Sequence, residues 1–157
     1  MRIDVTHFQK PEHPDGKLLL AYYEHQLANG TLPRRRDMPA REILSILPNM
    51  FILEPANAPA TDWRFRLMGQ HLVTRFGADA TGLCISQAYA SDQVEHNAAV
   101  YRAVVNGERL SITRGIFEGI DREFLEMEIV HVPMLGSDDK TRWILGGLFF
   151  EGEHLSV

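Results

Sequence analysis

The sequence has little cysteine and no long apolar run near its amino terminus. Its single cysteine, Cys84, excludes an intramolecular disulfide and is typical of a reducing compartment. The longest apolar run near that end, residues 18–23, is far shorter than the roughly 20 residues that a membrane-spanning helix needs. The first residues also lack the apolar core of a signal peptide. We therefore predict a cytoplasmic protein without a membrane partner.

Positively charged residues are also fewer than negatively charged ones. The chain has 16 lysines and arginines against 21 aspartates and glutamates, a net charge of -5, so it should repel nucleic acid unless it has a local basic patch. The one basic run, residues 34–36 with Arg41 nearby, is too short for durable binding of nucleic acid at physiological salt. We interpret it as a solvated linker and predict no nucleic-acid partner.

The common motifs of catalysis and metal binding are missing. The sequence has no CxxC or HExxH pattern, no phosphate-binding loop, and neither GxGxxG nor GxSxG. No two of its seven histidines are four residues apart, so no helix presents a histidine pair to a metal. These absences weaken the enzyme hypothesis, and we predict no catalytic and no metal-binding residue.

What the chain does have is enough length and apolar content for one globular domain, at 157 residues and 45% hydrophobic. Its most informative stretch starts with Trp63–Met68, where apolar residues alternate with two arginines as in a strand. Gly69 ends that strand. Leu72 and Phe76 then share one side of a short helix, which Gly77 can cap in a left-handed conformation.

The amino-terminal part is predicted to hold an irregular leader over residues 1–14 and an amphipathic helix from Asp15 to Gly30. The apolar face of that helix holds Leu19, Leu20, Tyr23 and Leu27. A basic linker over residues 31–37 follows, then a second helix that begins near Pro39 and that Pro48 stops. Its inward residues are predicted to be Ile43, Leu44 and Leu47.

The rest of the chain is predicted to contain a strand over residues 50–53, a long helix over 92–106 and three strands over 110–117, 124–132 and 142–150. Asp92 and Glu95 have the spacing of a capping box at the start of the helix. Its apolar stripe is Val94, Ala98, Tyr101 and Val105.

Tight turns join the last three strands, which indicates antiparallel neighbours. In the final strand, both faces are apolar: Trp143, Leu145 and Phe149 point one way, and Ile144, Leu148 and Phe150 the other. We therefore predict an α+β fold with a five-stranded antiparallel sheet, helices on one face and the amino-terminal helix available for the other.

Two stretches resemble the PAS domain: FRLMGQHLVTRFGADATG, residues 65–82, and VPMLGSDDKTRWILGG, residues 132–147. The sequence of these two stretches is similar to the single-domain PAS type that is common in alphaproteobacteria and was long classed as a domain of unknown function. The resemblance spans residues 38–150, which leaves residues 1–37 as an amino-terminal extension and 151–157 as a tail.

A PAS fold implies a cavity for a small molecule between the long helix and the inner face of the sheet. It also implies flanking helices that mediate dimerisation and pass a signal on. This sequence has no visible kinase, cyclase or DNA-binding segment, so a separate partner protein would carry the message.

Five residues are candidates for ligand contact in such a cavity: Arg66, Tyr101, Thr113, Met127 and His131. Arg66 would suit a carboxylate or phosphate, or would instead pair with an acidic side chain or reach the sheet edge. His131 could hydrogen-bond a ligand, or be a core histidine that a backbone carbonyl satisfies.

The ligand itself stays unknown, and the two cofactors best known from PAS proteins are disfavoured. His96, the candidate haem ligand on the long helix, lies opposite the apolar stripe and should face solvent. Cys84, in GLCISQ, lacks the asparagine and arginine that flank the reactive cysteine of flavin-binding PAS photoreceptors. A buried inert cysteine is the alternative.

Three functions remain open. The first is a non-catalytic sensor or interaction module, which we expect to be a homodimer. The second is a small α+β enzyme whose cone-shaped cavity holds an aspartate or histidine acid/base pair, but the strand carboxylates Glu126 and Glu128 lie on the face opposite Leu125. The third is a structural dimer module with a filled core. The predicted dimer interface is Leu19, Leu20, Tyr23 and Leu27, although the same stripe could dock on its own sheet.

Overall fold

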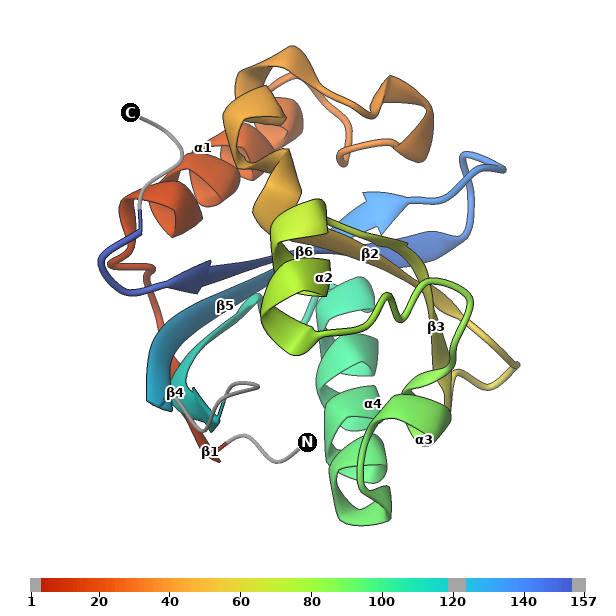
Figure 1. The fold of residues 1–157 in the computed structure, drawn as a ribbon. Coiled ribbons are helices and arrows are strands. Elements are labelled where there is room, and N and C mark those ends of the chain that lie inside the picture. The colour runs from red at the N-terminus through yellow and green to blue at the C-terminus, as the bar shows by residue number, and fades with distance from the viewer. Residues whose placement is uncertain (1–3, 119–123, 154–157) are drawn as a thin grey trace.

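The computed structural model describes residues 4–118 and 124–153 and consists of an antiparallel sheet with helices on both faces (Figure 1). The elements in chain order are β1 (Asp4–Phe8), α1 (Pro14–Ala28), η1 (Arg35–Asp37), η2 (Arg41–Asn49), β2 (Met50–Pro55), β3 (Trp63–Met68), α2 (Gln70–Phe76), α3 (Ile85–Ala88), α4 (Ser91–Val105), β4 (Ser111–Glu118), β5 (Phe124–Leu135) and β6 (Arg142–Phe150). The strand order is β1-β4-β5-β6-β2-β3.

The sheet has six strands in the described part of the chain, one more than the sequence predicted. The additional strand, β1, lies in the segment that we interpreted as an irregular leader. It pairs antiparallel with β4, from Asp4 opposite Ile116 to Phe8 opposite Ile112. A five-residue edge strand has too short an alternation of apolar and polar residues to be recognised in the sequence. Its hydrogen-bonding partner is also far away in the sequence, so no local pattern marks the pairing.

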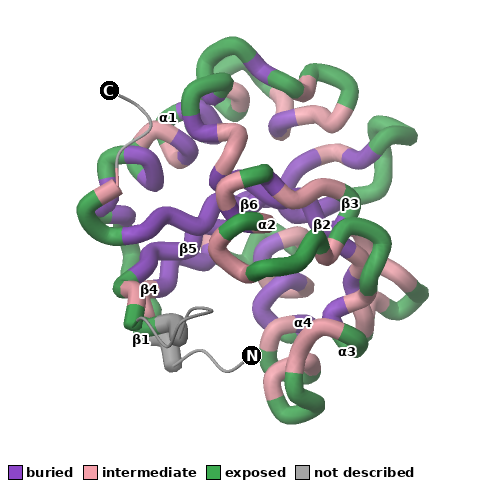
Figure 2. The backbone as a smooth tube through the Cα atoms, viewed as in Figure 1, coloured by how far each residue is buried: buried purple, intermediate pink, exposed green. Residues whose placement is uncertain are grey.

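Two cores, one on each face of the sheet, hold the molecule together. Strands β5 and β6, which contribute to both cores, are buried along most of their length (Figure 2). The cavity-side core lies between the sheet and α2, α3 and α4, and the opposite core lies under α1 and η2. The two faces of β6 divide between the cores as predicted, with Trp143, Leu145 and Phe149 in the opposite core and Ile144, Leu148 and Phe150 in the cavity-side core. The α+β class and the antiparallel arrangement are confirmed.

Helix α1 docks on its own sheet, against β5 and β6. Leu19 and Tyr23 are buried there, whereas Leu20 is half-buried and Leu27 is 46% exposed. Of the four predicted dimer-interface residues, only Leu20 and Leu27 therefore leave surface for a partner. The helix begins one residue before the predicted N-cap Asp15, because His13 is the N-cap and its Nδ1 accepts a hydrogen bond from the Asp15 amide.

The second predicted helix is η2, a 3-10 helix, and its inward face differs from the prediction. Ile43, Ile46 and Asn49 are buried, while Leu44 is 56% exposed. A 3-10 helix has three residues per turn, so residues spaced by three share a face and Leu44 is turned outward. Pro48 lies inside the last turn rather than beyond it.

Helix α4 begins at Ser91, and its N-cap Ala90 makes no side-chain capping bond, so the predicted capping box of Asp92 and Glu95 is wrong. The predicted stripe is partly right: Ala98 and Tyr101 are buried, and its outer members Val94 and Val105 are half-buried.

The alternation of inward and outward side chains along β3 is interrupted. The register against β2 shifts between Ile52 and Leu53, so that one extra residue, Arg66, forms a bulge.

Strand β5 continues past Pro133, where the sequence predicted its end. Strand β4 pairs with β5 only as far as His131, and beyond that point Pro133 is paired with β6 alone. A proline has no amide hydrogen to donate, so it is tolerated where one side of the strand has no neighbour. The first of the tight turns predicted between the last three strands, over residues 118–122, falls mostly outside the described residues.

Candidate functional site

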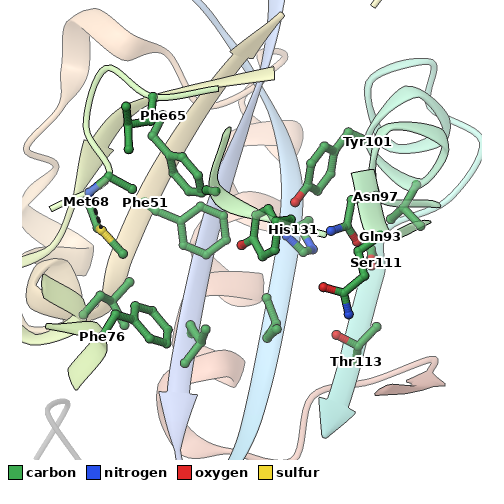
Figure 3. Close-up of a pocket in the computed structure, with 18 of the residues that line it drawn as sticks. Phe51, Phe65, Met68, Phe76, Gln93, Asn97, Tyr101, Ser111, Thr113 and His131 are labelled. Atoms are coloured by element: carbon green, nitrogen blue, oxygen red, sulfur yellow. Dashed lines mark hydrogen bonds between the residues drawn. The ribbon is translucent and has the colours of Figure 1, made fainter. Parts of the chain in front are cut away.

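A cavity of about 520 Å³ opens between the inner face of the sheet and helices α2 and α4 (Figure 3). Strands β1 to β6 supply one wall, with β1 contributing only His7, and the segment from α2 to α4 supplies the other. Strand alternation turns every second residue of each strand toward this space. The cavity therefore lies where a sheet and a connecting helix face each other, and its two ends have different chemistry.

One end is apolar and rich in aromatic rings. Its lining comes from β2, β3 and α2 and consists of Phe51, Phe65, Met68, Leu72 and Phe76. The rings of Phe51 and Phe65 meet edge to face, with centroids 6.5 Å apart. Met68 reaches this end because the bulge at Arg66 returns it to the same side as Phe65, and both lie in the cavity-side core.

The other end is polar, and Figure 3 shows its side chains gathered on the α4 and β4 side of the cavity. It is lined by Gln93, Asn97 and Tyr101 from α4, Ser111 and Thr113 from β4, and His131 from β5. Ser111 and His131 are directly opposite each other on the paired strands β4 and β5. Residues in such positions have neighbouring side chains, which brings a hydroxyl and an imidazole together.

His131 is the central group of the polar end. Its side chain is buried, with its ring centroid 5.2 Å from that of Tyr101 and 5.5 Å from that of Phe51. Burial, with a smaller contribution from nearby His7, lowers the pKa of His131 to about 4. The imidazole is therefore neutral near pH 7, with one nitrogen that donates and one that accepts.

Two buried polar atoms at this end have no hydrogen-bond partner among the described residues: Nδ1 of His131 and Oγ of Ser111. Buried polar atoms are normally paired, and an unpaired one costs about 1–3 kcal/mol. The structure therefore does not support the alternative in which a backbone carbonyl accepts a hydrogen bond from Nδ1 of His131. Both residues line the cavity.

Two tyrosines add hydroxyl groups to the cavity wall. Burial raises the pKa of Tyr101 well above its usual range, with a smaller contribution from Tyr89. Burial also raises the pKa of Tyr89 to about 12. Both phenols are therefore neutral near pH 7 and can donate hydrogen bonds.

Charge is confined to the rim of the cavity. Asp79, Asp92, His7 and His96 lie there and are exposed. The rings of His7 and His96 meet with centroids 6.3 Å apart, and burial is the main cause that lowers the pKa of His7. Among the described residues, no lysine or arginine lines the cavity.

Three of the five candidate ligand contacts line this cavity: Tyr101, Thr113 and His131. Met127 is on the predicted face but packs inside the core. Arg66 does not line the cavity, because it lies on the strand face opposite Phe65, where its side chain is 49% exposed. Its Nε lies 3.9 Å from the Glu54 carboxylate and its guanidinium lies over the ring of Trp143, which matches the alternative of an acidic partner.

The sequence interpretation missed several lining residues that a spacing argument could have found. Gln93, Asn97 and Tyr101 are four residues apart along α4, so they form one polar stripe toward the cavity. Ser111 is two residues before Thr113 on the same strand face. The bulge that brings in Met68 leaves no such signal in the sequence.

The residues weighed for cofactors lie at or beyond the edge of the cavity. His96 is exposed, as its helical position predicts, but it also lines the rim of the cavity on the same side of α4 as Gln93 and Asn97. Cys84 is the half-buried N-cap of α3 and does not line the cavity. No group of three or more metal-ligating side chains occurs among residues 4–118 and 124–153.

The two strand carboxylates lie on the face of β5 that the sequence predicted, opposite the cavity. Glu128 is buried there, and its carboxylate accepts hydrogen bonds from the amides of Glu12 and His13 and from Nε of Arg114. Glu126 is exposed. Neither carboxylate can reach the cavity from that side of the sheet.

A family model described as a PAS domain matches residues 11–149. No curated protein and no solved structure matches the chain. In the described part of the chain, no helix combines the length and the apolar character needed to cross a membrane.

Proposed function

The chain belongs to the PAS domain family, and from this we propose that it is a sensory module that binds a small molecule in the cavity between α4 and the sheet. The match covers nearly the whole chain, including every element that lines the cavity except β1, which contributes His7. Family membership by itself indicates a sensory or interaction module and no particular ligand. The case for a ligand therefore rests on the cavity.

One observation carries this proposal: the cavity combines about 520 Å³ of space with the unpaired Nδ1 of His131 and Oγ of Ser111. Small-molecule sites are typically mostly apolar, with a few convergent polar groups that orient the ligand. A filled core would instead pair its polar groups internally. The site thus favours ligand binding over a purely structural module.

We propose a non-catalytic role. The acid/base alternative needed ionisable groups that converge inside the cavity, and the strand carboxylates Glu126 and Glu128 are both on the other face of β5. The groups that do converge inside are neutral: an imidazole, phenols, hydroxyls and amides. Such groups recognise a ligand by hydrogen bonding.

We further propose that the module works as a homodimer and passes its signal to a separate partner protein. Helix α1 is the candidate for the dimer contact, because Leu27 remains exposed at its carboxyl-terminal end. The amino-terminal segment that leads into α1 is hydrogen-bonded to Glu128 on β5, and β5 also lines the cavity through His131. Strand β5 therefore contacts both the ligand cavity and the segment that leads into α1.

Native mass spectrometry of protein purified from its own host tests the proposal. We expect the native mass of each subunit to exceed its denatured mass by the mass of a retained molecule. Thr113→Trp, which fills the polar end with an indole ring, should remove that excess, whereas Thr74→Trp on exposed α2 surface should keep it. A wild-type protein without any added mass would contradict ligand retention and favour a structural module.

A further inference from the structure

The charge distribution of the cavity excludes one large class of ligands. A buried anion needs a cationic or multiply hydrogen-bonding partner to compensate for its lost hydration. The described lining residues include no lysine or arginine, and the two acidic residues at the rim, Asp79 and Asp92, repel negative charge. His131 supplies no positive charge either, because burial lowers its pKa to about 4. Carboxylates and phosphates therefore do not fit.

The polar end suits a group that both donates and accepts hydrogen bonds. Ser111 Oγ can do either, and a neutral imidazole donates from one nitrogen and accepts at the other. Both residues are more than nine-tenths buried, line the cavity and leave a polar atom unpaired. Because they face each other across β4 and β5, one small polar group of a ligand can reach both.

The apolar end suits a flat ring. Phe51, Phe65 and Phe76 present aromatic faces and edges there, and Met68 adds a thioether (Figure 3). Aromatic rings prefer edge-to-face or offset partners, and sulfur contacts ring edges favourably. Phe51 touches both ends, because it packs against Phe65 on one side and against His131 on the other. A ligand ring beside Phe51 would thus place a short polar substituent at His131.

We propose that the cavity takes an uncharged aromatic molecule whose single polar end both donates and accepts hydrogen bonds at Ser111 and His131. This inference rests on the proposed ligand-binding function and narrows it to a chemical class. The aromatic body lies among Phe51, Phe65 and Met68. The acidic rim excludes the negatively charged relatives of the same molecule.

Three probes of one shape test the class: biphenyl-4-carboxamide, biphenyl-4-carboxylate and 4-methylbiphenyl. They share the aromatic body and differ only in the group that reaches the polar end. Chemical-shift titration of the isotope-labelled protein near neutral pH gives the affinity of each. We expect the amide to bind at least about tenfold more tightly than the other two, since each lacks hydrogen bonds that the amide makes.

Substitutions at Ser111 and His131 test whether these two residues cause the tighter binding of the amide. His131→Phe keeps a ring but removes both nitrogens, and Ser111→Ala removes the hydroxyl. Each should weaken the amide by about tenfold and leave 4-methylbiphenyl nearly unchanged. His25→Phe, on the exposed surface of α1, is the matched control and should change neither affinity.

The outcomes separate this inference from the function on which it rests. Carboxylate binding as tight as amide binding overturns the uncharged class, and equal binding of all three overturns the role of Ser111 and His131. Failure of all three to bind overturns the aromatic class as well. In each case a molecule retained in native mass spectrometry would leave the ligand-binding function standing.

Discussion

His131 makes stability depend on pH, because it is neutral and buried in the folded protein but exposed in the unfolded chain. Between about pH 6.5, its ordinary pKa, and about pH 4, the unfolded chain binds a proton that the folded protein does not. Stability therefore falls as the pH drops through this window, and His131 adds no pH dependence above it. A shift of this size corresponds to about 3 kcal/mol over the whole window.

Urea unfolding of wild type and His131→Phe, each at about pH 7 and about pH 4.5, measures this contribution. We expect the wild type to lose about 2–3 kcal/mol more than the variant on acidification, because phenylalanine cannot take up a proton. The comparison cancels the effects of all other titrating groups. Equal losses in the two proteins would mean that His131 is protonated in the fold or already solvated.

Glu128 is the other buried residue with a large expected effect. Its carboxylate accepts two backbone amides from the segment before α1 and Nε of Arg114, at 2.7 Å from the Glu12 amide and 3.0 Å from Arg114. Glu128→Ala removes the acceptor that these donors share and should cost about 3 kcal/mol of unfolding free energy. Glu126→Ala, an exposed neighbour on the same strand face, should change it by less than about 0.5 kcal/mol.

Chemical denaturation of both glutamate variants measures their free energies of unfolding, and limited proteolysis shows which segment has been destabilised. If Glu128 anchors the amino-terminal segment, limited proteolysis of Glu128→Ala should cut between β1 and α1 before the sheet unfolds. A Glu128→Ala protein as stable as Glu126→Ala would show that Arg114 finds its compensation elsewhere, for example at Glu12, 3.1 Å away.

At the scale of elements, the joint between β3 and α2 depends on Gly69. A Cβ at this position would overlap the carbonyl of Pro48 in η2, which is backbone and cannot rotate away. The Gly69 amide also donates to the Met50 carbonyl at 2.7 Å, which holds the joint against the start of β2. Gly69→Ala should therefore destabilise the protein by about 2 kcal/mol or more.

Gly82 is the matched control, because it needs glycine for a different reason. Its φ is +90° and nothing lies within 4 Å of the point that a Cβ would occupy, so only backbone strain opposes a substitution. Asparagine tolerates positive φ better than alanine does, so Gly82→Asn should be more stable than Gly82→Ala. At Gly69 the order should reverse, since the larger side chain overlaps more. Thermal unfolding of the four variants checks both orders.

Elements whose pattern is local were predictable from the sequence, and those set by distant contacts were not. Strand β6 and its two apolar faces follow from alternation alone, as do the face assignments along β5 that put His131 in the cavity. Strand β1 was missed because its partner β4 is about a hundred residues away. The bulge at Arg66 was missed because a register shift depends on how β2 and β3 pair, and it brought Met68 into the site.

At the scale of the whole molecule, the two faces of β5 connect the cavity to the amino-terminal segment. Ile129 and His131 face the cavity, while Glu128 and Val130 face the segment before α1 and the core beneath it. A ligand that moves β5 would act on both faces, since a packed strand shifts as a unit. This arrangement gives α1 a physical route to respond to the cavity, and a dimer contact on α1 would carry that response outward.

The dimer prediction can be tested with one charge on α1. In a twofold interface each substituted residue appears twice, so Leu27→Glu places two like charges close together and removes apolar contact. We expect light scattering to give about twice the 17.8 kDa chain mass for the wild type and a shift toward the single-chain mass for Leu27→Glu. Leu44→Glu, at a similarly exposed leucine on η2, should remain dimeric. A wild type that runs as a single chain would contradict the dimer, and dissociation by Leu44→Glu alone would move the interface to η2.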